Sequence, residues 1–580
     1  MMTSSKYTFA FTLVLSLLVS GALAQTENQP KKFRVTGAAR GLLFGDDLNQ
    51  AGEQPDTITA PKLASGHTLV DLGVSIRPNQ SMEVLGLLRI RNDFGGFWGA
   101  GTTFDLRQLY VRGVVNNKVR YQLGDIDYKL TPYTLFNVDQ ETSFARPQAF
   151  QDYMDVVNYD NFYDFSNAWR QQGAAVDFGF VFRKYVREVN FNFFTSRINR
   201  TNFTSVSERL FSGLRMEVIQ SDLISFAATY VNMYDWAGTS RNTVHFNNPV
   251  ITGQINLTLP ERKDWQFTAT SEFGMSRQFY RGTEADPDMQ GAFGDLKIIA
   301  ELKPRNIVAT LNLHSVEADF RSPGAQTKRI NFNAAPQAFQ RITNEQSIRT
   351  FTLLDLLRET DLYNMQLSDE LMAFDPRYDN ITPYGEATPN RSGFALTIDH
   401  APADERYAVQ ATWLNFSELR GQGTTQFKNF QRFELLGNVN IHRWLPNYEK
   451  AIRLEAGLRQ DQTKRDGEEG VRAVDLSSTL MSAGFAIEFA KNLSLTGAVQ
   501  GIYYEGFDFL PLRSDFDQVV FYNEFEVDGL EQMIGLGLRY DFSANDYLTI
   551  QWNNFNSENN FGTLPNYEIN QLVFLFSMKF

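Results

Sequence analysis

The last fourteen residues of the chain, YEINQLVFLFSMKF at positions 567–580, decide the fold class. Apolar side chains fall on alternate positions of this stretch, and polar side chains lie among the residues between them. The alternating apolar residues are Leu572, Phe574, Phe576, Met578 and Phe580. A period of two predicts a β-strand with one apolar face, not a helix. An exposed row of phenylalanines would add little stability to a soluble protein, whereas a strand that closes a barrel in lipid places such a row in hydrocarbon.

The same alternation recurs in pairs of segments along the chain. Each apolar row is interleaved with charged, amide or small side chains, so one face of each predicted strand is apolar throughout. The clearest rows lie at 70–76, 82–90, 452–458, 534–542 and 548–552. A soluble sandwich would bury these faces against a second sheet, whereas a membrane barrel turns them to lipid.

The connections between the predicted strands are mostly short and long in alternation. Short turns are expected at 77–80, 116–118, 184–187, 220–222, 260–264, 303–306, 401–405, 445–449, 490–492 and 543–546. Short periplasmic turns and long outer loops are typical of outer-membrane barrels. With a first strand near 33–45 and a last strand at 567–580, we predict an all-β fold. It is a single-chain transmembrane antiparallel barrel of about 22 strands, in a range of roughly 18–24, with both termini in the periplasm.

The composition agrees with alternating strands. The chain has 580 residues, 49 Phe, 23 Tyr, no Cys, a formal net charge of −13 and a mean hydropathy of −0.32. After residue 24 no apolar run approaches the roughly 20 residues that a membrane-spanning helix needs. The absence of cysteine excludes disulfides and thiolate metal sites, and the negative charge argues against nucleic acid as a partner.

Residues 1–24 predict a secretory signal peptide. Lys6 supplies the positive charge, residues 9–19 form a short apolar run, and Ala22-Leu23-Ala24 is a small-residue cleavage site. The run is too short for a spanning helix, although an uncleaved anchor is the alternative. Cleavage would leave a short periplasmic tail at 25–32 and a barrel at 33–580, with no N-terminal plug domain.

Two long loops, 127–170 and 317–391, are rich in apolar and aromatic residues. The second includes a helical spacing of apolar residues that predicts a short helix at Glu345–Thr360. A lumen of about 22 strands needs something to fill it. We therefore expect both loops to fold inward as constriction or plug loops; the alternative is a structure above the membrane. The candidate constriction residues are Tyr133, Phe136, Tyr159, Phe162, Phe351 and Leu354.

Charged residues on the polar side of the predicted strands should point into the lumen. They are Arg89, Arg91, Arg112, Arg120, Arg432, Glu434, Arg453, Glu455, Arg459 and Arg539. One interpretation is a lumen that guides an anionic or sugar-like solute, because Arg supplies fixed charge and planar donors. The other is that Arg and Glu pair across neighbouring strands and brace the wall. Both signs occur on the same strands, which favours pairing for any single residue.

Patterns for catalysis and metal binding are weak. The five histidines include no pair at i, i+4 spacing, and the chain has no H-E-x-x-H or G-x-S-x-G motif. We expect no enzyme activity, no catalytic residue, no metal site and no cofactor. The acidic stretch Asp461–Glu469 lacks the residue order of a Ca²⁺ loop, which favours a solvated loop. Asp125 and Asp127 more plausibly bind a loop backbone or a cation than form a catalytic pair.

The final strand resembles the C-terminal signature of Gram-negative outer-membrane β-barrels, which implies recognition by the barrel-assembly machinery. Most of the chain also looks like the large outer-membrane barrels of Bacteroidota. That resemblance rests on the cleavable signal, the absent plug, the Asn- and Phe-rich strands, and Tyr121-Gln122-Leu123-Gly124-Asp125 leading into a long loop. It implies location and fold, and transfers no functional residue.

The leading functional hypothesis is an outer-membrane, porin-like channel for a small solute, constricted by its long loops. A second is a non-conducting structural or accessory barrel that binds a partner protein of an export or surface-assembly system. A third, a lipid-modifying enzyme, would need a Ser and His that are distant in sequence. Outer-membrane lipid is the expected surroundings in each case.

Overall fold

The computed structural model describes residues 32–50, 62–94, 101–136, 147–161, 171–282, 287–326, 352–358, 367–445, 448–561 and 566–580. The predicted signal peptide at 1–24 lies outside the described residues.

Twenty-two β-strands make up the wall of the molecule. The first eleven are β1 (Phe33–Gln50), β2 (Lys62–Asn79), β3 (Met82–Asp93), β4 (Thr102–Val115), β5 (Val119–Ile126), β6 (Gln171–Val181), β7 (Glu188–Asn199), β8 (Glu208–Ile219), β9 (Ile224–Trp236), β10 (His245–Thr258) and β11 (Trp265–Arg281). The second eleven are β12 (Asp288–Leu302), β13 (Ile307–Val316), β14 (Arg391–His400), β15 (Tyr407–Ser417), β16 (Asn429–Asn440), β17 (Ile452–Arg465), β18 (Val474–Ala490), β19 (Leu493–Arg513), β20 (Val519–Asp541), β21 (Tyr547–Asn559) and β22 (Tyr567–Lys579).

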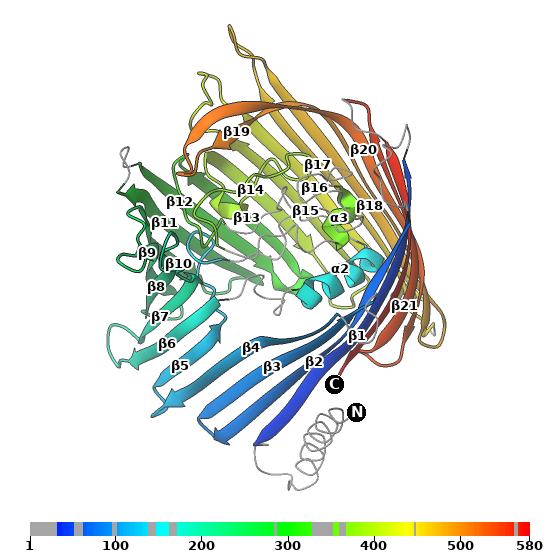
Figure 1. Cartoon of the computed structure of the whole chain (residues 1–580), viewed down its shortest axis with the longest axis horizontal. Helices are drawn as coiled ribbons and strands as arrows, with labels where there is room; N and C mark the ends of the chain where they lie inside the picture. The colour runs from blue at the N-terminus through cyan, green and yellow to red at the C-terminus, as the bar shows by residue number, and fades with distance from the viewer. Residues whose placement is uncertain are drawn as a thin grey trace.

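The strands close into a barrel (Figure 1). Each strand pairs antiparallel with the next, and β22 pairs antiparallel with β1 from Ala38–Lys579 to Gln50–Tyr567. The closure continues into the last residue, where the amide of Gly37 donates to the carbonyl of Phe580 at 2.7 Å. Closure leaves no unpaired strand edge, which the interior of a membrane does not tolerate. The predicted fold class is confirmed.

The two ends of the barrel differ in the length of their connections. Each of the ten predicted short turns coincides with a short connection between consecutive strands, from β2–β3 to β20–β21. The longer connections lie at the opposite end. The start of β1 and the end of β22 lie at the short-turn end, since Phe33 pairs with Ile76 next to the β2–β3 turn.

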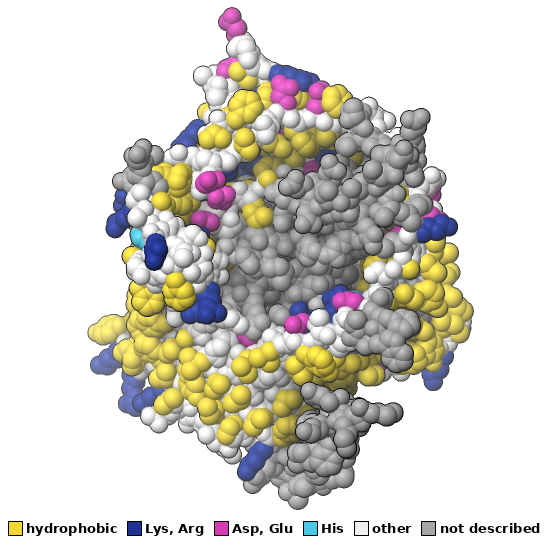
Figure 2. Space-filling model, viewed as in Figure 1, with side chains coloured by type: hydrophobic (Ala, Val, Ile, Leu, Met, Phe, Trp, Pro, Cys, Tyr) yellow, Lys and Arg dark blue, Asp and Glu magenta, His cyan; other side chains and the backbone are white. Residues whose placement is uncertain are grey.

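The two faces of the wall follow the sequence alternation. In β22, Leu572, Phe574 and Phe580 are exposed. Gln571 and Ser577, which lie between the apolar positions, are buried on the inside. Apolar side chains cover much of the outer flank of the barrel, and charged side chains appear around the central hollow (Figure 2). An apolar outside and a polar inside are what a barrel in lipid requires.

Among the described residues, two α-helices lie inside the barrel, α2 (Gln148–Asn161) and α3 (Leu353–Arg358) (Figure 1). Helix α2 belongs to the first long loop, where the sequence predicted no helix. Helix α3 lies within the predicted helix at 345–360, and the rest of that prediction, apart from Thr352, falls outside the described residues. Short 3₁₀ turns are η2 (Lys303–Arg305), η3 (Gly385–Ala387) and η4 (Ile441–Trp444). No described helix has the length and apolar content to cross a membrane.

The lumen as the candidate functional site

Helix α2 packs against the inner wall along an apolar face. Phe150 belongs to a buried cluster with Met533 and Phe555 from β20 and β21. Tyr153 and Val156 join a second cluster with Val573 and Leu575 on the inside of β22. These inward-facing apolar residues break the simple rule that the lumen face is polar. They explain why an aromatic-rich segment is stable inside the barrel.

The C-terminal end of α2 is held by basic side chains on β1, β2 and β3. Arg40 Nε lies 3.2 Å and His67 Nε2 lies 2.7 Å from the carboxylate of Asp160. Arg89 donates to the backbone carbonyl of Asp160 and, at 2.6 Å from Nε, to the carboxylate of Asp71. Cations at a helix C-terminus are favourable because the helix dipole is negative there.

The N-terminal end of α2 is held by strands further along the same wall. The backbone amide of Gln148 donates to Glu455 on β17 at 3.1 Å, so a carboxylate meets the positive end of the helix dipole. Asp152, one turn further on, pairs with Arg539 on β20 at 2.5 Å. Since these anchors lie on β17 and β20 and the basic residues lie on β1–β3, α2 runs along the inner wall between them, and we call it the strap.

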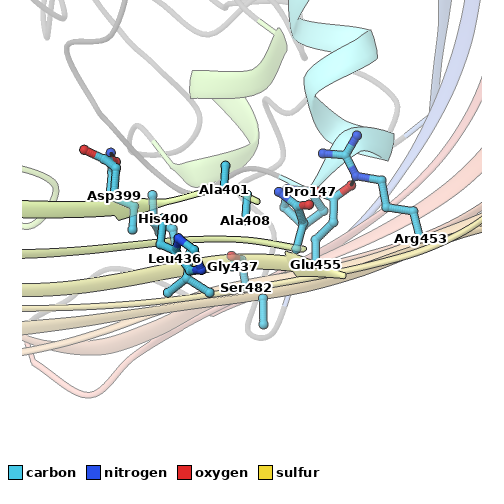
Figure 3. Close-up of a pocket in the computed structure, with 14 residues that line it drawn as sticks. Pro147, Asp399, His400, Ala401, Ala408, Leu436, Gly437, Arg453, Glu455 and Ser482 are labelled. Atoms are coloured by element: carbon cyan, nitrogen blue, oxygen red, sulfur yellow. Dashed lines mark hydrogen bonds and ion pairs between the residues drawn. The ribbon is translucent and has the colours of Figure 1, made fainter. Parts of the chain in front are cut away.

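A cavity of about 260 Å³ lies beside the start of this strap (Figure 3). It is lined by Pro147 from the strap and by wall residues that include Asp399, Arg453 and Glu455. Arg453 and Glu455 pair with each other at 3.0 Å. Both predicted lumen residues therefore line the cavity next to the strap, and Glu455 also holds the start of α2 in place.

Two glycines of the wall allow this close approach. A Cβ added at Gly484 on β18 would lie 2.5 Å from Pro147 Cβ, and one at Gly535 on β20 would lie 2.7 Å from the Phe150 ring. Any larger residue at either position would push the strap away from the wall. Glycine on the inside of a strand often marks such a close approach.

The second long loop is held by two buried ionic clusters. Arg377 pairs with Asp375 at 2.6 Å and with Glu531 on β20 at 3.3 Å. The Tyr378 hydroxyl donates to Glu531 at 2.8 Å. Burial and this carboxylate raise the pKa of Tyr378 well above its ordinary value.

The other cluster centres on Asp379. Arg432 on β16 lies 2.9 Å from Asp379 and 2.7 Å from Asp461 on β17. Arg459 pairs with Asp461 at 2.6 Å and donates to the Tyr378 carbonyl at 3.0 Å. Arginine suits such a site because its planar fork satisfies several acceptors at once.

A third inward segment is apolar. The ring of Tyr133 stacks on Phe293 with centroids 4.0 Å apart, and its hydroxyl donates to Asp295 at 3.0 Å. Tyr133 and Leu135 belong to one buried cluster with wall residues of β6 to β13.

Next to the wall at the long-loop end, burial and the carboxylates of Asp369, Asp517 and Asp515 raise the pKa of Glu370 to about 6.

The inward side chains of β3–β5 are different because several stay exposed. Arg112 is 51% and Arg120 72% exposed, and Asp105 on β4 is also exposed. Asp105 is opposite Arg89 in the β3–β4 register, so it is on the lumen side. Solvent therefore reaches the inner face near the two ends of β4 and at the start of β5, whereas Tyr110 between them is buried.

The ten predicted lumen charges thus divide into two groups. Arg89, Arg432, Glu434 and Arg459 are buried, and three of them bind the inward loops. Arg112 and Arg120 are solvent-accessible and lie 2.6 Å from Glu83 and 4.0 Å from Asp177 on neighbouring strands. Arg91 pairs with Asp93 on its own strand at 2.8 Å. Cross-strand pairing describes Arg89, Arg112, Arg120 and Arg432.

The predicted constriction residues are placed only in part. Tyr133 and Leu354 are buried, and Tyr159 lies with its ring centre 4.3 Å from the Arg40 guanidinium. Phe136 is half-buried and bonds through its amide to the Gly324 carbonyl. Phe162 and Phe351 lie outside the described residues.

Two further interpretations of acidic residues are settled by geometry. Asp461 belongs to strand β17, not to a loop, so the idea of an acidic loop beginning there is wrong. Its side chain is buried because Arg432 and Arg459 neutralise it. The Asp125 carboxylate accepts a hydrogen bond from the Leu109 amide at 2.5 Å, as expected for an acid that binds backbone.

Sequence reasoning missed the partners that hold the loops. Asp71, Asp160 and Asp379 are buried carboxylates at the centres of the clusters, and none was a candidate. Asp71 carried a usable signal, since it sits between outward-facing residues opposite Arg89 in a predicted hairpin. Asp160 and Asp379 lie in loops, where alternation gives no direction.

The fold and lumen define the class: a transmembrane β-barrel with its long loops folded inside. No family model and no curated protein matches the chain. Among solved structures, Pseudomonas aeruginosa OccK5 (OpdH) is 9% identical with a TM-score of 0.33, over 94% of this chain and 98% of that one. Acinetobacter baumannii OccAB4 is 7% identical with a TM-score of 0.35, over 96% and 100%.

The Acinetobacter baumannii outer-membrane channel DcaP is also similar, at 10% identity and a TM-score of 0.27, over 94% of this chain and 97% of that one. Similarity at this level places the chain in no family. The assignment to the class of transmembrane β-barrels therefore rests on the closed barrel itself.

Proposed function

We propose that the chain is an outer-membrane channel through which a small solute passes beside the strap. The observation that carries this proposal is a difference between two parts of the lumen wall, one packed by the loops and one exposed. The described parts of the long loops pack mainly against β6–β22, while lumen-facing residues on β4 and β5 stay exposed at Asp105, Arg112 and Arg120. A wide barrel narrowed by inward loops is the arrangement of a channel that restricts passage by size and charge.

The proposal includes location and orientation. The apolar outer flank needs lipid, and the short-turn end that holds both termini faces the periplasm by analogy with bacterial barrels. In this proposal, the signal peptide at 1–24 directs export, and the strand ending at Phe580 is read by the barrel-assembly machinery. A Bacteroidota-type relationship rests on the sequence features alone. We assign no catalytic step to the residues of the lumen.

A second candidate is an accessory barrel whose lumen does not conduct. The buried ionic clusters favour it, because loops fixed by several charged contacts resemble a permanent plug more than a gate. Such a barrel would use its long-loop end to bind a partner protein of an export or surface-assembly system.

Single-channel recording in planar bilayers separates the two candidates. If a solute passes beside the strap, the purified mature chain should give steady, repeated current steps. Insertion verified by resistance to external protease is the necessary control. Inserted barrels that stay silent at all voltages would contradict the channel and favour the accessory role.

A further inference from the structure

A second cavity lies at the long-loop end of the barrel, away from the strap. Its volume is about 470 Å³. Four separate parts of the chain supply most of its lining: residues 318–321, the loop and strand start at 374–391, the segment 420–430, and the hairpin of β19 and β20. β19 and β20 are the longest described strands, and β19 curves along the rim of the barrel in Figure 1. The mouth of a β-barrel is a common place for a ligand pocket.

Positive charge is in excess in the lining of this cavity. Five cationic side chains face three carboxylates there, although the whole chain has a net charge of −13. The cationic residues are Arg321, Arg391, Arg420, Lys428 and Arg513. Glu418 and Asp379 lie behind the lining near Arg391 and offset part of this charge, although Asp379 is itself paired with Arg432.

The ion pairs of the lining account for only part of the charge. Arg420 pairs with Asp319 at 2.5 Å and Lys428 with Asp508 at 2.6 Å. Asp517 is shared by two arginines, Arg321 and Arg513. Within the lining one carboxylate thus stands between two guanidiniums, and Glu370 with its acidic neighbours Asp369 and Asp515 lies close to Asp517 outside the lining.

Arg391 carries a charge that no ion pair within the described residues balances. Its guanidinium donates only to backbone carbonyls, at 2.9 Å to Ile381 and at 3.0 Å to Asn380 among others. It also stacks over the ring of Phe430, with its central carbon 3.5 Å from the ring centre. A buried cation held by dipoles and a ring is expensive unless an anion comes near.

Aromatic rings complete the cavity. Phe374, Tyr384, Phe430, Phe509 and Tyr522 line it together with the cations. Aromatic side chains and a few placed charges are the usual composition of a site for a small organic ligand.

We infer that this cavity is a capture site for a small organic anion that carries a carboxylate or phosphate on a ring. The inference rests on the proposed function, since it names the class of solute that reaches the lumen. Arg420 and Arg513 bind the anionic group, and the rings pack on the flat face of the solute. A phosphorylated sugar ring of lipopolysaccharide has the same chemistry, so the experiment must separate a bound lipid from a free solute.

Calorimetric titration of the folded full-length barrel in detergent tests this inference. Phenyl phosphate should bind, while benzyl alcohol, which has the ring without the charge, should bind at least about tenfold more weakly. Arg420→Gln and Arg513→Gln should each weaken phenyl phosphate binding by about tenfold or more. The matched control is Arg472→Gln, because Arg472 is 50% exposed at the same end, pairs with Glu526 at 2.8 Å and does not line the cavity.

Equal binding of benzyl alcohol, an equal loss in Arg472→Gln, or no binding of phenyl phosphate would overturn the inference. Binding of lipopolysaccharide without binding of the free solute would overturn it as well. The titration does not depend on conduction. A barrel that conducts but binds no phenyl phosphate therefore refutes the capture site alone, and one that binds but stays silent refutes the channel alone.

Discussion

At the scale of single residues, the lumen is held together by buried charges that each have several partners. Arg89 is 1% exposed and bonds to the Asp71 carboxylate and to the end of the strap. Removing one member of such a group leaves the others charged and unpaired in a site of low dielectric. Exposed pairs on the same wall contribute little by comparison.

Arg89→Met should therefore destabilise the barrel by about 3–5 kcal/mol, because the buried Asp71 carboxylate loses its cation and the Asp160 carbonyl loses its donor. The measurement is urea-induced unfolding in lipid vesicles, followed by tryptophan fluorescence. Arg120→Met is the matched control, since Arg120 is 72% exposed and lies 4.0 Å from its carboxylate. It should change the free energy of unfolding by less than about 0.5 kcal/mol. Equal effects of the two substitutions would contradict the anchoring role of Arg89.

The acidic side chains at the long-loop end give a prediction in pH. The pKa of Glu370 is raised to about 6 by burial and by Asp369, Asp517 and Asp515. A raised pKa means that the folded state binds this proton more tightly than the unfolded state does. Its contribution to stability is therefore present below about pH 4.5 and is lost as the pH rises through about 6.

Glu370→Gln should consequently unfold like the wild type at pH 4 and be the more stable protein at pH 7. The difference between the two proteins, measured across this pH range by thermal unfolding in detergent, isolates this group from other carboxylates. The effect is small because the side chain is partly exposed. A stability gap that does not change between pH 4 and pH 7 would contradict the assignment.

At the scale of elements, the strap α2 is the feature that turns a wide barrel into a restricted one. It approaches the wall where the wall has glycine, at Gly484 and Gly535. Its two ends meet charges that match the helix dipole, with Glu455 at the start and basic residues at the end. The position of the strap is thus determined by several independent contacts.

Because the chain has no cysteine, a designed disulfide can test this position cleanly. Pro147→Cys with Gly484→Cys should form a disulfide under mild oxidation. The two Cβ atoms would start 2.5 Å apart and need to separate only to roughly 3.8 Å. A thiol-reactive reagent of high mass reports the remaining free thiols on a gel. Pro147→Cys with Ala483→Cys, at the exposed outer-face neighbour of Gly484 on β18, should stay reduced. Free thiols in both pairs would place the strap elsewhere.

The strands and the strap differ in how far the sequence predicts them. A strand such as β22 is visible in its own residues, because alternation needs only neighbours and a face in lipid. The ten short turns follow for the same reason. The position of helix α2 cannot be predicted from its own residues. Glu455 and Arg539, which hold it, lie about 300 and 390 residues away in sequence. The candidate arginines were correctly directed inward by alternation, but their loop partners Asp160 and Asp379 follow no period.

At the scale of the whole molecule, the barrel combines a lipid-facing outside, a packed part of the lumen and an accessible part. Charged side chains lie around the central hollow in Figure 2, and the described loops fill the side next to β6–β22. Passage of a solute depends on the accessible part, along β4 and β5, being a continuous water path.

Cysteine accessibility on β5 tests that path most directly. Arg120 faces the lumen, and Leu123, three residues along and 50% exposed, faces outward. A charged, membrane-impermeant thiol reagent is added during recording of single-channel current from Arg120→Cys and from Leu123→Cys. The account predicts a lasting drop in current for Arg120→Cys and none for Leu123→Cys. No drop for Arg120→Cys, with its thiol shown to be modified, would contradict a solute path along this wall.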